Sequence, residues 1–226
     1  PPAQSGHRYH PDPQRRLPNN SAAYPPKPDV EPFLRARSSL VESKSAERGI
    51  FSRVASQKQA AKNGRRDADR EFGTNPCSEI ILRPYQFCNL TEVVIRSTDT
   101  EETLAEKVRL ATILGTIQST YTKFPYLRKL WENNTAEERL LGVSMTGIMD
   151  NTTVSTGPDA PEILARLRQV AVDTNALWAE NLGVAVSTAI TAVKPSGTVS
   201  QLVDSASGIH TRHSDYYIRT VRGDNN

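Results

Sequence analysis

The stretch from residue 73 to residue 96, GTNPCSEIILRPYQFCNLTEVVIR, decides the fold of this chain and contains its two cysteines. An apolar run at 80–82 is interrupted by Pro84, and a second run rich in β-branched residues follows at 93–95. Short runs of this kind, bounded by turn residues, are typical of strands. The stretch therefore predicts a loop, a short strand, a second loop and a second strand.

Helices are expected to alternate with these strands. A capping-box pattern at Thr98 and Glu101 begins one, and apolar residues then recur at helical spacing until Pro125. A longer helix is predicted from Asp159 to Gly183. Residues 184–193 have the composition of a strand, and a turn at 194–197 leads into another helix. This alternation predicts an α/β fold.

The front of the chain is different. Residues 1–32 hold nine prolines and predict neither helix nor strand. Residues 31–70 predict two helices separated near Gly49. This part is also basic, with 14 Lys/Arg against 7 Asp/Glu in residues 1–70, whereas residues 71–226 have 14 against 18. No nucleic-acid motif or interleaved aromatic residues accompany the charge, so we expect a solvated surface and no nucleic-acid partner.

Composition narrows the class of protein. With 226 residues, 37% hydrophobic and 23% charged, the chain has ordinary soluble composition. Its apolar runs are far shorter than the roughly 18 residues of a transmembrane helix, and no signal-peptide pattern is present. We therefore expect no membrane partner and a cytoplasmic location. Because the sequence starts at Pro1 and stops without a closing element, we interpret it as a piece of a longer protein.

The first candidate site is the stretch 74–80, TNPCSEI. Pro76 stiffens the backbone before Cys77, and in an extended segment Cys77 and Glu79 would point to the same side. A thiol and a carboxylate could then face one ligand. The alternative is that Cys77 is a small buried hydrophobic residue and Glu79 a surface charge.

The second candidate site is the stretch 194–201, KPSGTVSQ. A strand that leads through a Ser/Gly/Thr turn into a helix gathers backbone N–H groups and hydroxyls, which suits an anion. The alternative is that Ser196 or Thr198 only caps the helix. A third stretch, 208–219, contains His210 and His213, but no thiol or carboxylate stands at a clear ligand spacing from them, so no metal site is predicted.

Taken together, these stretches resemble one family. NPCSEI followed by FCNL, with Cys88 eleven residues after Cys77, resembles the finger-loop region of adenosylcobalamin-dependent (class II) ribonucleotide reductases. KPSGTVSQL resembles the substrate-phosphate loop of that family, and 208–219 resembles its GIH.RHS.YYIR segment. The stretches LPNNSA at 17–22 and SKSAERGIF at 43–51 are also similar, although Ala46 stands where the family usually has glycine. The phrasing leans towards the triphosphate-reducing branch.

The resemblance implies roles for individual residues. Cys77 would become a thiyl radical that takes hydrogen from the ribose 3′ carbon, Glu79 would be the general base on the 3′ hydroxyl, and Asn75 would hydrogen-bond the ribose region. Cys88 would be half of a redox-active disulfide. The substrate phosphate would bind the residues Pro195, Ser196, Gly197, Thr198, Val199 and Ser200, with Asn19 and Asn20 near the base.

The resemblance also implies an architecture and partners. Residues 17–226 would form part of a ten-stranded α/β barrel, with the finger loop near 73–90 and the phosphate loop at 194–201, and residues 1–16 stay unassigned and are expected to be disordered. The cofactor would be adenosylcobalamin, and the reductant thioredoxin or a similar dithiol. The partner cysteine of Cys88 and the deoxynucleotide/ATP effector site would lie outside this chain, so the isolated chain is expected to be inactive.

Two rival functions remain open at this point. One is a non-catalytic module that binds a nucleotide or phosphate through Pro195–Ser200, with a structural disulfide between Cys77 and Cys88. The other is a basic nucleic-acid-binding piece formed by residues 35–70. Neither accounts for three motifs in one order.

Overall fold

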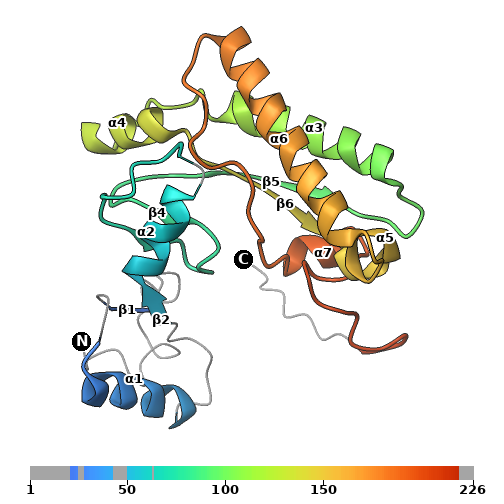
Figure 1. The fold of residues 1–226 in the computed structure, drawn as a ribbon, viewed down its shortest axis with the longest axis horizontal. Helices are drawn as coiled ribbons and strands as arrows, with labels where there is room; N and C mark the ends of the chain where they lie inside the picture. Colours follow the sequence, from blue (N-terminus) through green and yellow to red (C-terminus); the bar gives the residue numbers. More distant parts are fainter. Residues whose placement is uncertain (1–20, 25–27, 43–49, 63, 219–226) are drawn as a thin grey trace, which may run out of the picture.

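The computed structural model describes residues 21–24, 28–42, 50–62 and 64–218 (Figure 1). The predictions for residues 1–16, Asn19, Asn20 and the stretch around Ala46 and Gly49 lie outside these ranges.

The centre of the fold is a pair of parallel strands with helices packed on one face (Figure 1). Strand β5 (Asn89–Val94) pairs with β6 (Leu141–Thr146) in the register Asn89↔Leu141, and a bridge from Val143 to Thr191 continues the order. Helix α3 (Glu101–Gln118) lies between β5 and β6 in the chain, and helix α6 (Ala160–Leu182) lies between β6 and the bridge at Thr191. The two helices pack against each other. The predicted α/β arrangement is confirmed as a partial sheet; the strands described do not close into a barrel.

The core follows from the alternation of the strands. Val93, Leu141 and Val143 point to the helices, where Val108 and Ala171 complete one buried cluster. A second cluster joins the end of β5 to the first turns of the helices, and its members are Ile95, Leu104, Val154, Ile163 and Leu167.

Smaller elements complete the described chain. Near the N-terminus, β1 (Ala22–Tyr24) pairs in parallel with β2 (Ile50–Ser52), and α1 (Val30–Glu42) and α2 (Arg53–Ala61) confirm the two predicted helices. A two-residue hairpin, β3 (Gly73–Thr74) with β4 (Ile81–Leu82), precedes β5. Helix α4 (Lys129–Glu138) leads into β6, and η3 (Ile148–Asp150), α5 (Thr152–Ser155) and α7 (Thr198–Leu202) are short.

Three local predictions were wrong. Residues 1–32 were predicted to contain no strand, but β1 lies within them. It is stabilised by pairing with a segment 28 residues away, in the register Ala22↔Ile50. The capping box of α3 is formed by Thr100 and Thr103, because Thr98 lies in a turn closed by the Asp99 N–H to the Arg96 carbonyl.

The third wrong prediction is a continuous strand over 184–193. Only Thr191 forms a bridge, and the segment before it is held by helix α6, since the Asn175 Oδ1 accepts the Ser187 N–H at 3.0 Å. The apolar residues at helical spacing were expected to form one buried face on each helix. Two of them, Leu114 of α3 and Leu177 of α6, are instead 63% and 56% exposed.

In the ranges that the structure describes, none of the helices combines the length and the apolar character needed to cross a membrane.

Candidate active site

The cysteine loop, residues 75–80, lies between β3 and β4. Asn75 closes it from both sides: its N–H donates to the Ile80 carbonyl at 3.3 Å, and its Oδ1 accepts the Ile80 N–H at 2.9 Å. The Ser78 N–H donates to the Asn75 carbonyl at 3.0 Å, which places Pro76 and Cys77 at the centre of a tight turn. Proline is favoured at the first central position of such turns, so the sequence itself fixes this conformation.

Because of this turn, the expected extended geometry is wrong. Ser78 has a φ of +64°, in the left-handed region. This turn of the backbone makes the side chains of Cys77 and Glu79 point in different directions. Cys77 is exposed, whereas the side chain of Glu79 is only 2% exposed. The alternative of a buried cysteine and a surface glutamate is therefore wrong for both residues.

The buried Glu79 meets the first residue of the second motif. Lys194 Nζ donates to Glu79 Oε1 at 2.8 Å, across 115 positions of sequence. The Lys194 side chain is 29% exposed, so water reaches one side of the pair. The other carboxylate oxygen, Glu79 Oε2, is buried and has no hydrogen-bond partner among the described residues. One oxygen of the carboxylate is thus fixed, and the other can accept a hydrogen bond from a ligand.

Cys88 lies close enough to this pair to respond to its charges. Burial raises the pKa of the Cys88 thiol, the negative charge of Glu79 raises it further, and the positive charge of Lys194 lowers it. Burial lowers the pKa of Lys194, but the hydrogen bond and charge of Glu79, with smaller contributions from Cys77 and Cys88, more than offset this and raise it. Both cysteines are free thiols, so the structural disulfide of the rival module is absent here.

The phosphate loop, residues 194–201, has a buried base and an exposed crest. Ser196 and Ser200 are buried, whereas Gly197, Thr198 and Val199 are exposed. Ser196 Oγ donates to Glu92 Oε2 at 2.9 Å, and Ser200 Oγ donates to the Gly197 carbonyl at 2.8 Å. Neither Ser196 nor Thr198, nor any other described side chain, caps α7, so the capping alternative is wrong. The two serine hydroxyls hold the loop together, and the crest is the part that a ligand can reach.

The third motif packs beneath this loop. Gly208 has a φ of +55°, and a Cβ there would lie 3.0 Å from the Lys194 carbonyl oxygen, so glycine is required on both counts. Ser207 Oγ donates to the Ser196 carbonyl. Arg212 then fastens the segment by ion pairs to Asp150 at 2.9 Å and Asp204 at 3.0 Å.

The same segment contains the two histidines. His210 Nδ1 lies 3.2 Å from the Ser207 carbonyl, and the His213 ring packs edge-on against Tyr217. Within the described residues, no group of three or more His, Cys, Asp or Glu side chains could hold a metal ion. The histidines therefore have local contacts that account for their placement.

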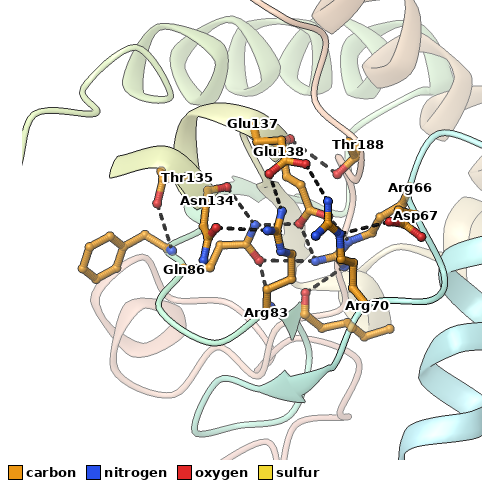
Figure 2. Close-up of polar contacts among 12 residues, drawn as sticks. Arg66, Asp67, Arg70, Arg83, Gln86, Asn134, Thr135, Glu137, Glu138 and Thr188 are labelled. Atoms are coloured by element: carbon orange, nitrogen blue, oxygen red, sulfur yellow. Dashed lines mark hydrogen bonds and ion pairs between the residues drawn. The ribbon is translucent and has the colours of Figure 1, made fainter. Parts of the chain in front are cut away.

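A buried polar network fixes the chain on both sides of the cysteine loop (Figure 2). Arg66 binds Glu138 at the end of α4 with two hydrogen bonds, Nε to Oε1 at 3.0 Å and Nη2 to Oε2 at 2.7 Å. Arg66 Nη1 also donates to the Ile81 carbonyl at 2.9 Å, and Gln86 Nε2 donates to Glu138 Oε2 at 2.6 Å. Residues before, within and after the β3–β4 hairpin are thus attached to one helix end.

Two cavities adjoin Glu79. The smaller, about 160 Å³, is lined by Glu79 together with Arg65, Arg168, Thr188 and Thr191. The larger, about 550 Å³, is mostly apolar, and Glu79 and Arg168 line it together with Met145, Leu164 and Ile209. The buried carboxylate therefore lies beside space that a ligand could enter.

Sequence reasoning missed two residues of this site. Lys194 was included in the motif but was given no role, and Glu92 was not considered. Lys194 had one signal, because it directly precedes the proline of the phosphate loop. Glu92 had none, since its contact with Ser196 spans 104 positions.

The fold and the site define an α/β protein in which a thiol, a buried carboxylate and a serine-rich loop lie close together beside a pair of parallel strands. Comparison with known proteins identifies the relatives. No family model matches the chain. It is 30% identical to the adenosylcobalamin-dependent ribonucleoside-triphosphate reductase of Lactobacillus acidophilus, over 66% of this chain and 23% of the relative.

Other relatives carry the same description. The reductase of Lacticaseibacillus paracasei is 29% identical over 81% of this chain and 28% of its own length, and a probable one from Dictyostelium discoideum is 29% identical over 68% and 20%. The crystal structure of a B12-dependent (class II) ribonucleotide reductase matches with a TM-score of 0.53 and 29% identity, over 64% of this chain and 23% of that one.

The matched part of this chain is therefore homologous to part of the class II ribonucleotide reductases and shares their fold. The chain spans about a quarter of the length of the curated relatives it matches, 20% to 28% in the three named.

Proposed function

We propose that this chain is part of the catalytic domain of a class II ribonucleotide reductase, which reduces ribonucleotides, triphosphates in particular, to 2′-deoxyribonucleotides for DNA synthesis. The observation that supports this best is the 2.8 Å contact between Glu79 and Lys194, because it joins the cysteine motif to the phosphate-loop motif. Residues 17–226 would then be one portion of a ten-stranded α/β barrel, with the cysteine loop as its central finger loop.

In this proposal, Cys77 carries the radical. Adenosylcobalamin, when bound, would supply the radical chemistry that converts the Cys77 thiol to a thiyl. The exposed position of Cys77 at the tip of a turn fits such an encounter, since its sulfur can be approached from outside the chain. Part of the cofactor site is assigned to the portion of the enzyme that this chain does not span.

Three residues of the cysteine loop are assigned to the ribose of the substrate. The Cys77 thiyl takes the hydrogen atom from the 3′ carbon, so that one C–H bond breaks and one S–H bond forms. Glu79 accepts the proton of the 3′ hydroxyl through Oε2, the oxygen left without a partner. Asn75 lies in the same loop and is assigned to the ribose region.

Removal of the 2′ oxygen as water requires two electrons and two protons. Cys88 and a second cysteine outside this chain supply them and become a disulfide, which thioredoxin or a similar dithiol reduces. The raised pKa of Cys88 suits this role, because a thiol that stays protonated brings its proton with its electron. A cytoplasmic location follows from the need for such a reductant.

The substrate phosphates are assigned to the phosphate loop. Its exposed crest, from Gly197 to Val199, offers backbone N–H groups and the Thr198 hydroxyl, while Ser196 and Ser200 hold the shape of the loop from beneath. The predicted substrate residues thus divide into those that would contact phosphate and those that support the loop. Asn19 and Asn20 stay assigned to the neighbourhood of the base.

The rival module with a structural disulfide is not favoured, because both cysteines are free thiols and the relatives are reductases. The rival nucleic-acid-binding piece rests only on the basic charge of the front of the chain, and the relatives are reductases.

The test is ribonucleotide reduction by a chimera in which residues 17–226 replace the matching segment of a complete class II enzyme. With adenosylcobalamin and a dithiol, we expect the chimera to reduce ribonucleoside triphosphate and its Cys77→Ser variant to be inactive. Ser97→Ala, on the surface between β5 and α3, is the matched control and should keep full activity. A chimera that folds and binds nucleotide but reduces none of it, or a Cys77→Ser variant that still turns over, would refute the proposal.

A further inference from the structure

Lys194 has a position that the proposed function does not explain. It is the first residue of the phosphate loop, yet its ammonium group binds the buried Glu79 carboxylate of the cysteine loop at 2.8 Å. A lysine that served only the phosphate would be expected to point at the crest. The Lys194 side chain is instead mostly buried, with 29% of its surface exposed, and the side chain of its partner Glu79 is 2% exposed.

The carboxylate that it holds is incompletely satisfied. A buried ionised carboxylate can accept several hydrogen bonds, and native structures rarely leave one of its oxygens without a donor. Lys194 binds Oε1, and no group of the described chain binds Oε2. A substrate hydroxyl would supply the missing donor.

The backbone around Lys194 is also constrained. The ring of Pro195, the next residue, fixes its own φ. Gly208 packs so closely that a Cβ there would lie 3.0 Å from the Lys194 carbonyl oxygen. The position of the Lys194 backbone is therefore fixed by the third motif, and its ammonium group is the contact that joins the phosphate loop to the cysteine loop.

We propose that Lys194 is a positioning residue for the reaction. It fixes the Glu79 carboxylate through Oε1, leaves Oε2 for the substrate hydroxyl, and so makes the placement of the base depend on the phosphate loop. The inference rests on the proposed function for the identity of the substrate, but the ion pair and its effect on neighbouring thiols can be tested without turnover.

The neighbouring thiol that reports on the pair is Cys88. Its pKa responds to Glu79 and Lys194 with opposite sign, as described above. Among the described residues, the other ionisable groups near the pair are Cys77 in the cysteine loop and the two arginines that line the smaller cavity, Arg65 and Arg168. All of these stay unchanged in the variants below, so differences between variants report on Lys194 and Glu79.

The first test is the pH dependence of alkylation by iodoacetamide in the 226-residue chain, with tandem mass spectrometry to follow each cysteine separately. Lys194→Met should raise the midpoint for Cys88 by about one pH unit, the usual size for loss of a nearby opposite charge. Glu79→Gln should lower it, and Lys194→Arg should leave it near the wild-type value. Lys129→Met, which removes a lysine paired with Glu132 on α4, is the matched control and should change nothing.

Loss of Lys194 alone leaves a buried negative charge, and circular dichroism will reveal whether that variant folds. If it does not, the comparison of Glu79→Gln with the double variant Glu79→Gln/Lys194→Met isolates the same effect, because no uncompensated carboxylate remains. We expect a higher midpoint in the double variant. Equal midpoints in that pair, or a Lys194→Met profile equal to that of Lys129→Met, would overturn the contact.

The second test separates positioning from phosphate binding in the active chimera. A residue that positions the base should affect turnover, so Lys194→Met should lower kcat at least about tenfold with a change in KM below about threefold. Lys194→Arg should recover part of the loss. A raised KM with unchanged kcat would instead make Lys194 a phosphate ligand and overturn the inference. Failure of the proposed function is distinguishable, because the chimera would then be inactive with Lys194 intact while the alkylation profiles still shift.

Discussion

Glu138 and Glu79 are both buried glutamates with a basic partner, and they differ in how completely they are satisfied. Glu138, at the end of α4, is 5% exposed and accepts two hydrogen bonds from Arg66 and one from Gln86, so both of its oxygens are occupied. Glu79, in the cysteine loop, accepts one from Lys194 and has an unpartnered oxygen.

The difference teaches how to tell a structural carboxylate from a functional one. A buried ion pair contributes to a fold only when hydrogen bonds satisfy both groups, as they do around Arg66. A buried carboxylate with an unpartnered oxygen costs free energy, and that cost is understandable where a ligand completes the bonding. The first pair attaches the hairpin to α4 (Figure 2), and the second faces the cavities.

The largest effect expected from this comparison is on turnover. Glu79→Gln in the active chimera should lower kcat by about 10²- to 10⁴-fold, the usual contribution of a general base, because the amide cannot accept the hydroxyl proton. The stability of the 226-residue chain should change by less than about 1 kcal/mol, since the partly exposed Lys194 can turn to water. Urea unfolding measures the second quantity. A large loss of stability would place Glu79 in the same class as Glu138.

The next effect is on stability. Arg66→Met should lower the free energy of unfolding by about 3–5 kcal/mol, because it leaves Glu138 buried with its main partner removed. Urea unfolding followed by circular dichroism measures this loss. Lys129→Met is the matched control: this residue on α4 is 71% exposed, and loss of its surface ion pair with Glu132 should cost less than about 1 kcal/mol. The double variant Arg66→Met/Glu138→Leu should recover part of the stability, and a double variant no more stable than Arg66→Met would argue against an electrostatic cause.

The smallest effect concerns the backbone that places Glu79. Ser78 adopts a φ of +64°, which costs a residue with a side chain roughly 1 kcal/mol more than glycine. Ser78→Gly should therefore raise the free energy of unfolding by about 0.5–1 kcal/mol in the same urea measurement. Ser97→Gly, at an exposed position without positive φ, should be neutral or destabilising. Equal effects of the two substitutions would show that the turn at Ser78 is not strained.

Much of the regular structure followed from local patterns. The helix from Asp159 to Gly183 was predicted with its ends, because proline in the first turn and glycine after the last turn are direct signals. The predicted helix start at Thr198 is also confirmed. Strand β6 and helix α4 received no prediction, although Leu141, Val143 and Met145 alternate as a half-buried strand does.

The residues of the candidate site stay a prediction, and their geometry differs from the one expected. Pro76 correctly indicated a fixed loop around Cys77, but the positive φ at Ser78, which sends Cys77 outward and Glu79 inward, has no signal in a serine. The serines of the phosphate loop were expected to bind a ligand, yet Ser196 and Ser200 are buried and hold the loop.

The sequence by itself determined the motifs, their order and the elements that carry them, because turns, caps and hydrophobic periodicity act over a few residues. Only the tertiary structure decided which charges meet. The Lys194–Glu79 pair spans 115 positions, and the Arg66–Glu138 pair spans 72. Such contacts depend on how strands and helices pack, and no local pattern of residues encodes a contact across so many positions of sequence.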